Sequence, residues 1–344
     1  MVLGALGLVI ATPTPVEACG GFFSGPVKLA PELRPSLSRE KVLIVHDAAR
    51  GREHFIREVA FRRADQTFGF VVPTPSRPEV AKVEKNPFTR LRSDFPFKPP
   101  DDGIGAGFGG RGVGPVEVLA IEKVGSFTAF ILAATDATAL SGWLKDNKLT
   151  STPETDVWLE HYVRMGFYYV AMRYDPPTDA RGRKGRAIAA ETVRISFDTP
   201  IAYYPYFEPE PRHSAKDPRL LEVWYVGTDP VVPVAQYTDP AQANGPARWV
   251  RPLRPGQKKP QARKRLAAGL LSELEALLPE GELVVQTFQD QKRRRSGFKD
   301  ILFAFAEPQT LTPERTAAIE AMLGVLDAGL VRPHGPAGPT AEVP

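Results

Sequence analysis

Cysteine is nearly absent from this chain of 344 residues, which contains only Cys19. A lone cysteine cannot close a disulfide within the chain, and it cannot build a cysteine-based zinc site. Histidine is sparse as well, with five residues, and none lies at a compact ligand spacing such as His-Glu-x-x-His. The sequence therefore offers no motif for a metal, and we expect neither a metal nor another cofactor.

The apolar run at the N-terminus is too short to cross a bilayer. It covers Val2–Ala11, whereas a membrane-spanning helix needs about 20 residues. Val16-Glu17-Ala18 is typical of the small-residue cleavage site of a secretory signal, although no Lys or Arg precedes the run. We interpret residues 1–18 as a signal peptide, the alternative being a buried N-terminal strand or helix. The protein is then expected to be exported to the periplasm or cell envelope, or to the outer surface.

Cys19 becomes the first residue of the mature chain if cleavage follows Ala18. Three roles stay open for it: a lipidated anchor, a nucleophile activated by its own α-amine, or a structural residue. Glu17 disfavours lipidation, because leucine and small residues normally precede a lipidated cysteine. A membrane contact is expected only in the lipidated case.

Proline is abundant, and the 35 prolines are about twice the usual share. They indicate turns and edge strands rather than a helical bundle. Strand signals such as Lys41–Asp47 are mixed with helix signals, for example Thr152 to Gly166 and the leucine stripe of 262–278. Because the two kinds do not strictly alternate, we predict an α+β fold: mostly antiparallel sheets, a few packed helices and proline-rich loops.

Composition divides the rest of the chain into four parts. Residues 19–244 are predicted to form the main α+β domain, in which the Gly- and Pro-rich stretch 86–115 is a flexible loop. Residues 245–261 are interpreted as a basic linker. A smaller α/β segment over 262–332 and a disordered tail over 333–344 are expected to follow.

Basic side chains concentrate late in the chain. The span 245–300 has 13 basic and 6 acidic residues, and its densest run is Lys292, Arg293, Arg294 and Arg295. Nucleic acid is not expected as a partner, since no aromatic stacking pattern accompanies the run and export argues against it. The run is interpreted as a solvated loop, or as a contact with anionic envelope polymers or another envelope protein.

An aromatic and proline-rich segment is the best candidate for recognition. It contains Tyr203, Tyr204, Tyr206 and Phe207. Rigid rings of this kind stack on sugars or accept proline-rich peptides. The competing interpretation places the rings in the core, because a strand sends alternate side chains to its buried face.

Several short motifs carry no chemistry that we can assign. Gly105–Gly110 matches a dinucleotide fingerprint as a string, without the strand before it and the helix after it that the mechanism needs. Ser296 and Lys299 have the spacing of some acyl-enzymes, without their partner motifs. His46 and His54 could face each other across a hairpin, where a surface pair is favoured over a metal site. No catalytic residue is predicted.

Three stretches together resemble a known family. They are Ala18-Cys19-Gly20-Gly21-Phe22-Phe23; Phe70–Pro75 with Pro78-Glu79-Val80; and Leu140–Asn147 followed by Tyr162–Met172 and Thr199–Pro205. Their order and spacing over residues 18–230 resemble an uncharacterised family of exported bacterial proteins that carries a domain-of-unknown-function label. Its members often have a second cysteine just after the Cys-Gly-Gly-Phe-Phe stretch, where this chain has Ser24. The resemblance implies export and envelope association, and it transfers no catalytic residue.

The sequence thus predicts an exported bacterial envelope protein that acts by binding or as a structural component rather than by catalysis. The alternative is a hydrolase acting on envelope glycan or peptide through residues that the sequence does not identify.

The signal-peptide interpretation can be checked by mass spectrometry of the protein from its native host. We expect a mature chain that lacks residues 1–18, because the apolar run and Val16-Glu17-Ala18 match a cleaved signal. An intact Met1, or protein confined to the cytoplasm, contradicts the interpretation. A mass that matches unmodified Cys19 excludes lipidation.

Overall fold

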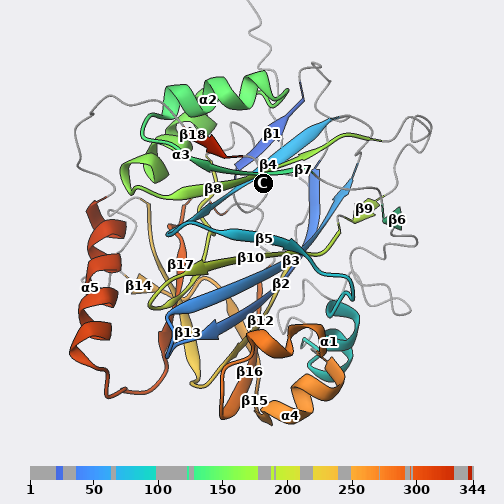
Figure 1. Ribbon diagram of the computed structural model, residues 1–344, viewed down its shortest axis with the longest axis vertical. Helices are drawn as coiled ribbons and strands as arrows, with labels where there is room; N and C mark the ends of the chain where they lie inside the picture. The colour runs from blue at the N-terminus through green and yellow to red at the C-terminus, as the bar shows by residue number, and fades with distance from the viewer. Residues whose placement is uncertain are drawn as a thin grey trace, which may run out of the picture.

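The computed structural model describes residues 21–25, 36–62, 67–97, 122–123, 128–176, 187–189, 191–209, 220–238, 249–270, 272–290, 295, 297–328 and 340–342. Within them the chain forms three β-sheets with helices packed against them (Figure 1). No helix in these ranges is both long and apolar enough to cross a membrane.

The largest sheet has nine strands. Seven of them follow one another in the order β15-β16-β12-β2-β3-β10-β5, and β9 pairs with both β3 and β6 beside this path. Their bounds are β2 (Ser36–Asp47), β3 (Arg52–Arg62), β5 (Glu79–Lys82), β6 (Glu122–Lys123), β9 (Ala187–Ala189), β10 (Val193–Asp198), β12 (Leu220–Gly227), β15 (Arg254–Ala262) and β16 (Glu282–Asp290).

Two smaller sheets pack beside it. One has the order β1-β4-β8-β7-β18 and the other β11-β17-β13-β14. Their bounds are β1 (Gly21–Ser24), β4 (Phe68–Thr74), β7 (Thr128–Ala133), β8 (Tyr168–Tyr174), β18 (Thr340–Glu342), β11 (Ala202–Tyr204), β13 (Val231–Gln236), β14 (Trp249–Val250) and β17 (Ile301–Phe305). Among the described pairs only β12–β2 and β6–β9 are parallel, so the predicted α+β class with mostly antiparallel sheets is confirmed.

The helices cover different parts of these sheets. In Figure 1, α2 and α3 lie at the top over the five-stranded sheet, α1 and α4 lie at the lower right, and α5 runs along the left edge. Their bounds are α1 (Phe88–Asp94), α2 (Ala137–Asp146), α3 (Pro153–Arg164), α4 (Arg263–Arg265) and α5 (Pro313–Ala328), with a π-helical turn η5 (Leu266–Leu270) and a 3-10 turn η6 (Ser272–Leu277).

The central sheet is buried on both faces, which explains the continuous apolar run of β2. Val42 and Ile44 belong to the larger core between the sheets, whereas Leu43 and Val45 belong to a smaller core under α1 and the 263–278 turns. Successive side chains of a strand point to opposite faces. Each face of β2 therefore needs apolar residues of its own.

The start of β1 packs tightly against α3. A Cβ atom at Gly21 would lie 2.7 Å from Cζ3 of Trp158, which is closer than Cβ atoms normally approach another atom, so a larger residue would displace the ring or the strand. Phe23 follows with 0% exposure. The glycine and phenylalanine of this early motif thus serve to seat the strand beside the helix.

Local signals fix the ends of α2 and α3. The carboxylate of Asp136 accepts hydrogen bonds from the backbone N–H groups of Thr138 and Ala139 at 2.6 and 3.0 Å, as an N-cap. Thr152 caps α3 in a reciprocal arrangement with Thr155, and Pro153 fills the first turn. Gly166 follows α3 with a φ of 70°, in the left-handed region that favours glycine.

The predicted flexible loop 86–115 is wrong over its first part. Phe88 and Leu91 of α1 are fully buried, and the ring centroid of Phe88 lies 5.7 Å from that of Trp224. The side chain of Asn86 accepts a hydrogen bond from the backbone N–H of Phe88 at 2.9 Å. Two buried apolar residues and this hydrogen bond hold the short helix against the core. Residues 98–115 lie outside the described part.

The predicted basic linker 245–261 is wrong where it is described. β14 and β15 lie in this range, and Lys258 to Ala262 of β15 pair with β16, with a bulge after Pro255. Lysine and proline suit a strand at the edge of a sheet, because they discourage pairing with further chains. The lysines and prolines that suggested a linker belong instead to an edge strand, which they protect from pairing with other chains.

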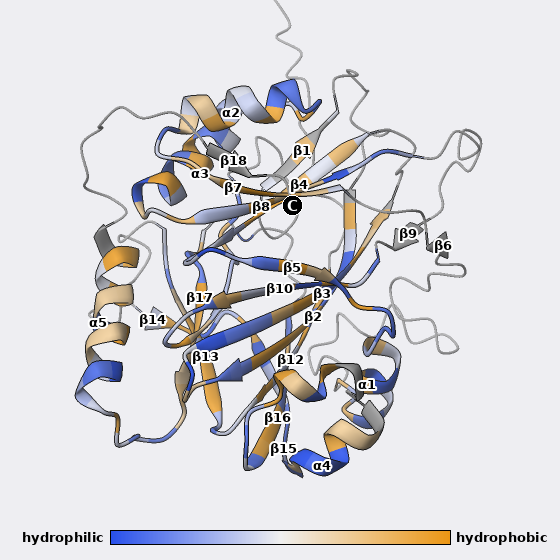
Figure 2. Ribbon diagram, in the orientation of Figure 1, coloured by the Kyte–Doolittle hydropathy of each residue, from blue (hydrophilic) through white to orange (hydrophobic). Residues whose placement is uncertain are grey.

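The proposed boundary at 262 also disagrees with the structure. The helix expected over 262–278 is broken into α4, η5 and η6, and Figure 2 shows α4 as hydrophilic. β16 pairs with β12 and β15, and β17 pairs with β11 and β13, so this segment is woven into the main sheets. Thr340–Glu342, expected in a disordered tail, pair with β7 as β18.

The seating of α1 can be tested by replacing Leu91 with alanine. We expect the free energy of unfolding to fall by about 2–5 kcal/mol, because the change leaves a cavity in the smaller core. Thr89→Ala on the exposed face of the same helix should change it by less than about 0.5 kcal/mol. Chemical denaturation measures both values, and equal values for the two variants would contradict the packing of α1.

Candidate binding groove

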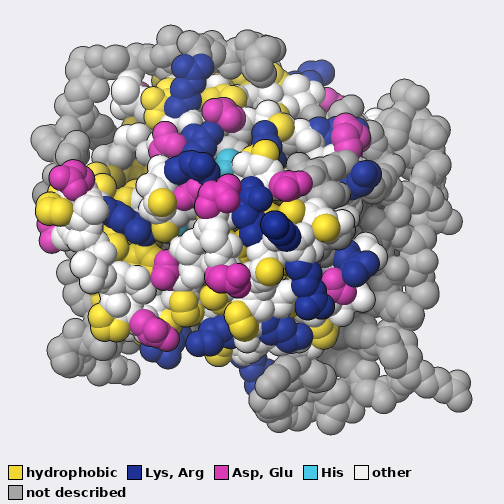
Figure 3. Space-filling model, turned by 60° about the horizontal axis from the view of Figure 1, so that its bottom comes forward, with side chains coloured by type: hydrophobic (Ala, Val, Ile, Leu, Met, Phe, Trp, Pro, Cys, Tyr) yellow, Lys and Arg dark blue, Asp and Glu magenta, His cyan; other side chains and the backbone are white. Residues whose placement is uncertain are grey.

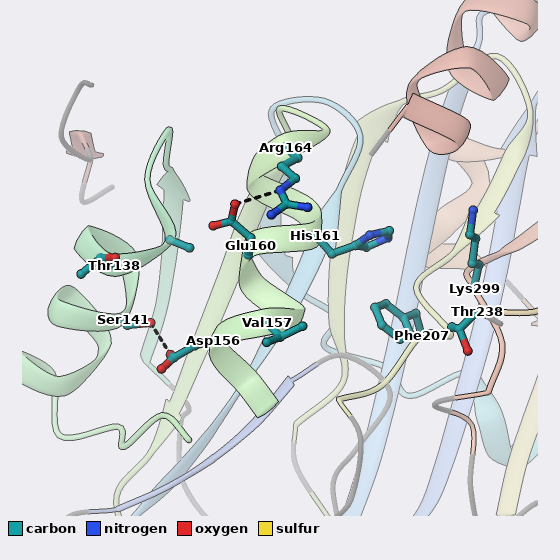
Figure 4. A pocket seen from close by; sticks show the side chains of 11 residues that line it. Thr138, Ser141, Asp156, Val157, Glu160, His161, Arg164, Phe207, Thr238 and Lys299 are labelled. Carbon is teal, nitrogen blue, oxygen red and sulfur yellow. Dashed lines mark hydrogen bonds and ion pairs between the residues drawn. The ribbon is translucent and has the colours of Figure 1, made fainter. Parts of the chain in front are cut away.

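A groove of about 500 Å³ opens beside α3. Its residues come from α2, from α3, and from the facing side formed by Phe207, Thr238 and Lys299. Figure 4 shows α3 between these two sides. This volume is within the usual range for small-ligand sites, which is about 300–1,000 Å³.

Two stripes of α3 face the groove. Asp156, Glu160 and Arg164 follow one another at four-residue spacing, and Val157 and His161 form a second stripe beside them. Side chains four apart lie on one face of a helix. In Figure 4 the acidic residues point toward α2, and His161 points toward Phe207 and Lys299.

The acidic stripe is engaged in local pairs. The hydroxyl of Ser141 on α2 donates to Oδ1 of Asp156 at 2.6 Å. Nε of Arg164 lies 2.8 Å from Oε1 of Glu160. The first pair joins α2 to α3, and the second lies within α3 between residues one helical turn apart.

His161 is the titratable ring of the groove. Its centroid lies 5.1 Å from that of Phe207 and 5.0 Å from that of Tyr162, both in edge-on contact. Burial, together with the positive charges of Lys299 and Arg164, lowers the pKa of His161 to about 4. The imidazole is therefore neutral at physiological pH, and it can donate or accept a hydrogen bond.

Lys299 reaches the groove from a turn that is tied to β13. Its backbone N–H donates to the carbonyl of Gln236 at 2.8 Å, and its Nζ donates to Oε1 of the same residue at 3.1 Å. The backbone N–H of Thr238 donates to the carbonyl of Gly297 at 3.1 Å. The position of the ammonium is thus set by two separate connections to one strand end.

Asp300 lies directly behind the groove and is 6% exposed. Tyr162 of α3 and Tyr203 of β11 donate their hydroxyls to it at 2.9 and 2.6 Å, and the backbone N–H of Phe207 donates at 2.9 Å. Burial outweighs these hydrogen bonds and raises the pKa of Asp300 to about 6.

Exposed apolar side chains occur in the groove and in the smaller cavity next to it. Among the described residues, the large hydrophobic side chains that are exposed are Val157, at 70%, and Trp249, at 40%. Val157 lines the groove, and Trp249 lines a smaller cavity that shares His161 and Lys299 with it. Exposed apolar groups around a concave site mark surfaces that bind ligands or partners.

The aromatic segment contributes one ring to this site. Tyr203, Tyr204 and Tyr206 have 0% exposure, so their rings pack in the core, and only Phe207 is partly exposed and lines the groove. The core interpretation therefore holds for the three tyrosines. Recognition by exposed tyrosines is wrong because the segment lies under α3 and between the sheets.

The last residue of the predicted basic run, Arg295, is buried and is not part of a solvated loop. Arg295 is 1% exposed, with its Nε 2.8 Å from Oδ2 of Asp290 and its Nη1 3.7 Å from Oε1 of Glu208. Lys292, Arg293 and Arg294 lie outside the described residues, as does Cys19. Where Figure 3 brings the lower face forward, basic and acidic side chains are intermingled rather than gathered by sign.

His46 and His54 do not form a pair. His46 lies opposite Glu53 and His54 opposite Val45 across the β2–β3 hairpin, so the two rings point to opposite faces of the sheet. Within the described ranges no group of three His, Cys, Asp or Glu side chains is arranged to hold a metal.

No sequence pattern identifies His161 and Lys299 as residues of a binding site. His161 lies in no ligand motif, and the only pattern that includes Lys299 is its spacing from Ser296, a residue outside the described part. The signal in the sequence is that Val157 and His161, four residues apart, lie off the apolar stripe of α3 that Trp158, Leu159 and Tyr162 form.

A family model described as "uncharacterized protein conserved in bacteria", DUF2330, matches residues 17–207. The chain belongs to this family. The DUF2330 match includes α2, α3 and Phe207, whereas Thr238 and Lys299 lie beyond it. The groove of this DUF2330 protein is therefore built from both the matched residues and those that follow.

Other comparisons add little to the family assignment. No curated protein matches the chain. The crystal structure of baculovirus P35 is similar over 80% of this chain and 99% of that chain, with 8% sequence identity and a TM-score of 0.38. A likeness of this size supports no conclusion about fold or function.

The pH dependence of stability should reveal the buried carboxyl group. Because the folded chain raises the pKa of Asp300 to about 6, Asp300 lowers stability as the pH rises through roughly 4 to 6. His46, His54 and His161, with a pKa of about 4 each, act in the opposite direction, and their contribution is lost as the pH falls below about 6.5.

Asp300→Asn should therefore steepen the rise of unfolding free energy with pH over this window. The difference in slope should accumulate to roughly 3 kcal/mol between about pH 4 and neutrality. Denaturant titrations at several pH values measure it, and the exposed Asp146→Asn should follow the wild type. Parallel curves for wild type and Asp300→Asn would rule out an elevated pKa.

Proposed function

We propose that this DUF2330 protein is an exported envelope protein that acts by binding, and that the groove beside α3 is its binding site. One observation carries the proposal. Exposed apolar and aromatic side chains converge on a concave surface with a few polar groups that are held in place, namely His161, Thr238 and Lys299. This combination is typical of recognition sites, in which apolar area supplies affinity and a few polar groups orient the ligand.

Export is supported by the sequence of the N-terminus. The short apolar run and Val16-Glu17-Ala18 match a cleaved signal, and the family itself is bacterial. The envelope is then the place in which the groove meets its ligand.

A hydrolase acting on envelope glycan or peptide is the second candidate, and Asp300 is the observation that favours it. A carboxyl group with a pKa of about 6 suits general acid–base chemistry near neutral pH, and Asp300 lines the smaller cavity beside His161. Against this role, its oxygens already accept hydrogen bonds from Tyr162, Tyr203 and Phe207.

Hydrogen exchange on the mature protein, with and without an envelope extract of the native host, tests the binding role. The extract should slow exchange in α3 and around Phe207, because a ligand in the groove stabilises them, and it should leave β15 unchanged. Unchanged exchange in α3 would overturn the proposal.

Two variants sharpen this experiment. Val157→Asp puts a charge in the middle of the groove at a position that is 70% exposed, so it should abolish the protection without unfolding the chain. Thr89→Asp on α1 is the matched control and should keep it. Cleavage of extract components that is lost in Asp300→Asn would instead establish the hydrolase.

A further inference from the structure

The two halves of the groove differ in charge. The half toward α2 contains Asp156 and Glu160, each already paired with Ser141 or Arg164. The half toward Lys299 is lined by the ring of Phe207, the neutral imidazole of His161, the hydroxyl of Thr238 and the ammonium of Lys299. Figure 4 shows His161 pointing from α3 into this second half.

The second half combines an apolar wall with a positive end. Phe207 and Val157 provide apolar surface, and Lys299 provides a charge whose backbone and side chain are both anchored on Gln236. No carboxylate lines this half among the described residues, and the nearest one behind it, Asp300, is screened by the two tyrosine hydroxyls that donate to it. An anion bound in this half contacts the ammonium of Lys299 and two hydrogen-bonding groups, the imidazole of His161 and the hydroxyl of Thr238.

Resting on the binding role proposed above, we propose that this half of the groove binds a small amphiphilic carboxylate, whose anionic group lies between Lys299 and His161 and whose apolar body lies against Phe207 and Val157. A hydrogen bond between charged groups, in a site that is partly shielded from water, is worth more than a neutral one. A volume of about 500 Å³ has room for an aromatic or branched apolar body.

The binding of this ligand should change the pKa of His161, because charged groups lie around the ring. The charges that act on it are those of Arg164 on α3 and Lys299 on the turn before β17. Asp300 lines the smaller cavity together with His161, whereas Asp156 and Glu160 point toward α2. Lys299 and Arg164 add to the effect of burial in lowering the pKa of His161 to about 4. A bound carboxylate opposes both cations, so the pKa of His161 should rise when the site is filled.

Three probes of one shape test the inference on the full mature chain: 3-phenylpropionate, its neutral amide 3-phenylpropionamide, and the cation 3-phenylpropylamine. The imidazole carbon signal of His161, assigned with His161→Gln, reports binding by NMR. We expect 3-phenylpropionate to shift this signal in a saturable way and to raise the pKa of His161. The amide should bind about tenfold more weakly and the amine not at all, because only the acid offers Lys299 a negative partner.

Lys299→Gln should weaken the binding of 3-phenylpropionate by about tenfold. Lys145→Gln, an exposed lysine of α2 outside the groove, should leave it unchanged. Equal binding of acid and amide by the wild-type chain would overturn the inference without any variant, and so would an undiminished affinity in Lys299→Gln.

The outcome is separable from that of the proposed function. If the envelope extract protects α3 from exchange while none of the three probes shifts His161, the groove binds but the ligand class is wrong. If the probes bind as described while the extract gives no protection, the carboxylate site stands and the envelope role is overturned.

Discussion

The carboxylate of Asp300 is taken almost completely out of water, and two segments that are distant from it in sequence, α3 and residues 203–207, donate hydrogen bonds to it. Burying an ionised carboxylate costs several kcal/mol unless donors replace its water shell. Tyr162 from α3, Tyr203 from β11 and the backbone of Phe207 are those donors. Because these hydrogen bonds join α3 to the turn before β17, they set the distance between the two sides of the groove.

Tyr203 also connects this hydrogen-bond network to the largest sheet. The backbone N–H of Tyr203 donates to Oε2 of Glu53 at 2.7 Å, and Glu53 is fully buried in β3. Burial raises the pKa of Glu53 well above its usual range. Tyr203 thus bridges two buried carboxyl groups, one in the large sheet and one behind the groove. The segment that looked like a recognition surface is the link between the layers of the molecule.

Sequence patterns predicted the regular parts of the fold, because those parts depend on local physics. The cap and proline at Thr152 and Pro153 and the glycine at 166 gave α3 almost to the residue. The patterns failed where tertiary contacts override composition. β15 is rich in Lys and Pro because it is an edge strand, and α1 forms inside a Gly- and Pro-rich stretch because Phe88 and Leu91 find a core to fill. Most of the site could not be predicted from the sequence, because His161 and Lys299 are brought together only by the pairing of β13 with β17 and the packing of α3.

The order of strands in the large sheet has a consequence for how the chain assembles. β2 lies between β3, its neighbour in sequence, and β12, which pairs with it in parallel and begins only at Leu220; β16 then covers β12. The long β2–β3 hairpin therefore keeps an open edge until most of the polypeptide has been synthesised, and contacts of such long range form slowly. A chain cut short before β12 would expose that edge to other chains. Late closure of this kind keeps a nascent polypeptide unfolded for longer, which is compatible with the export proposed above.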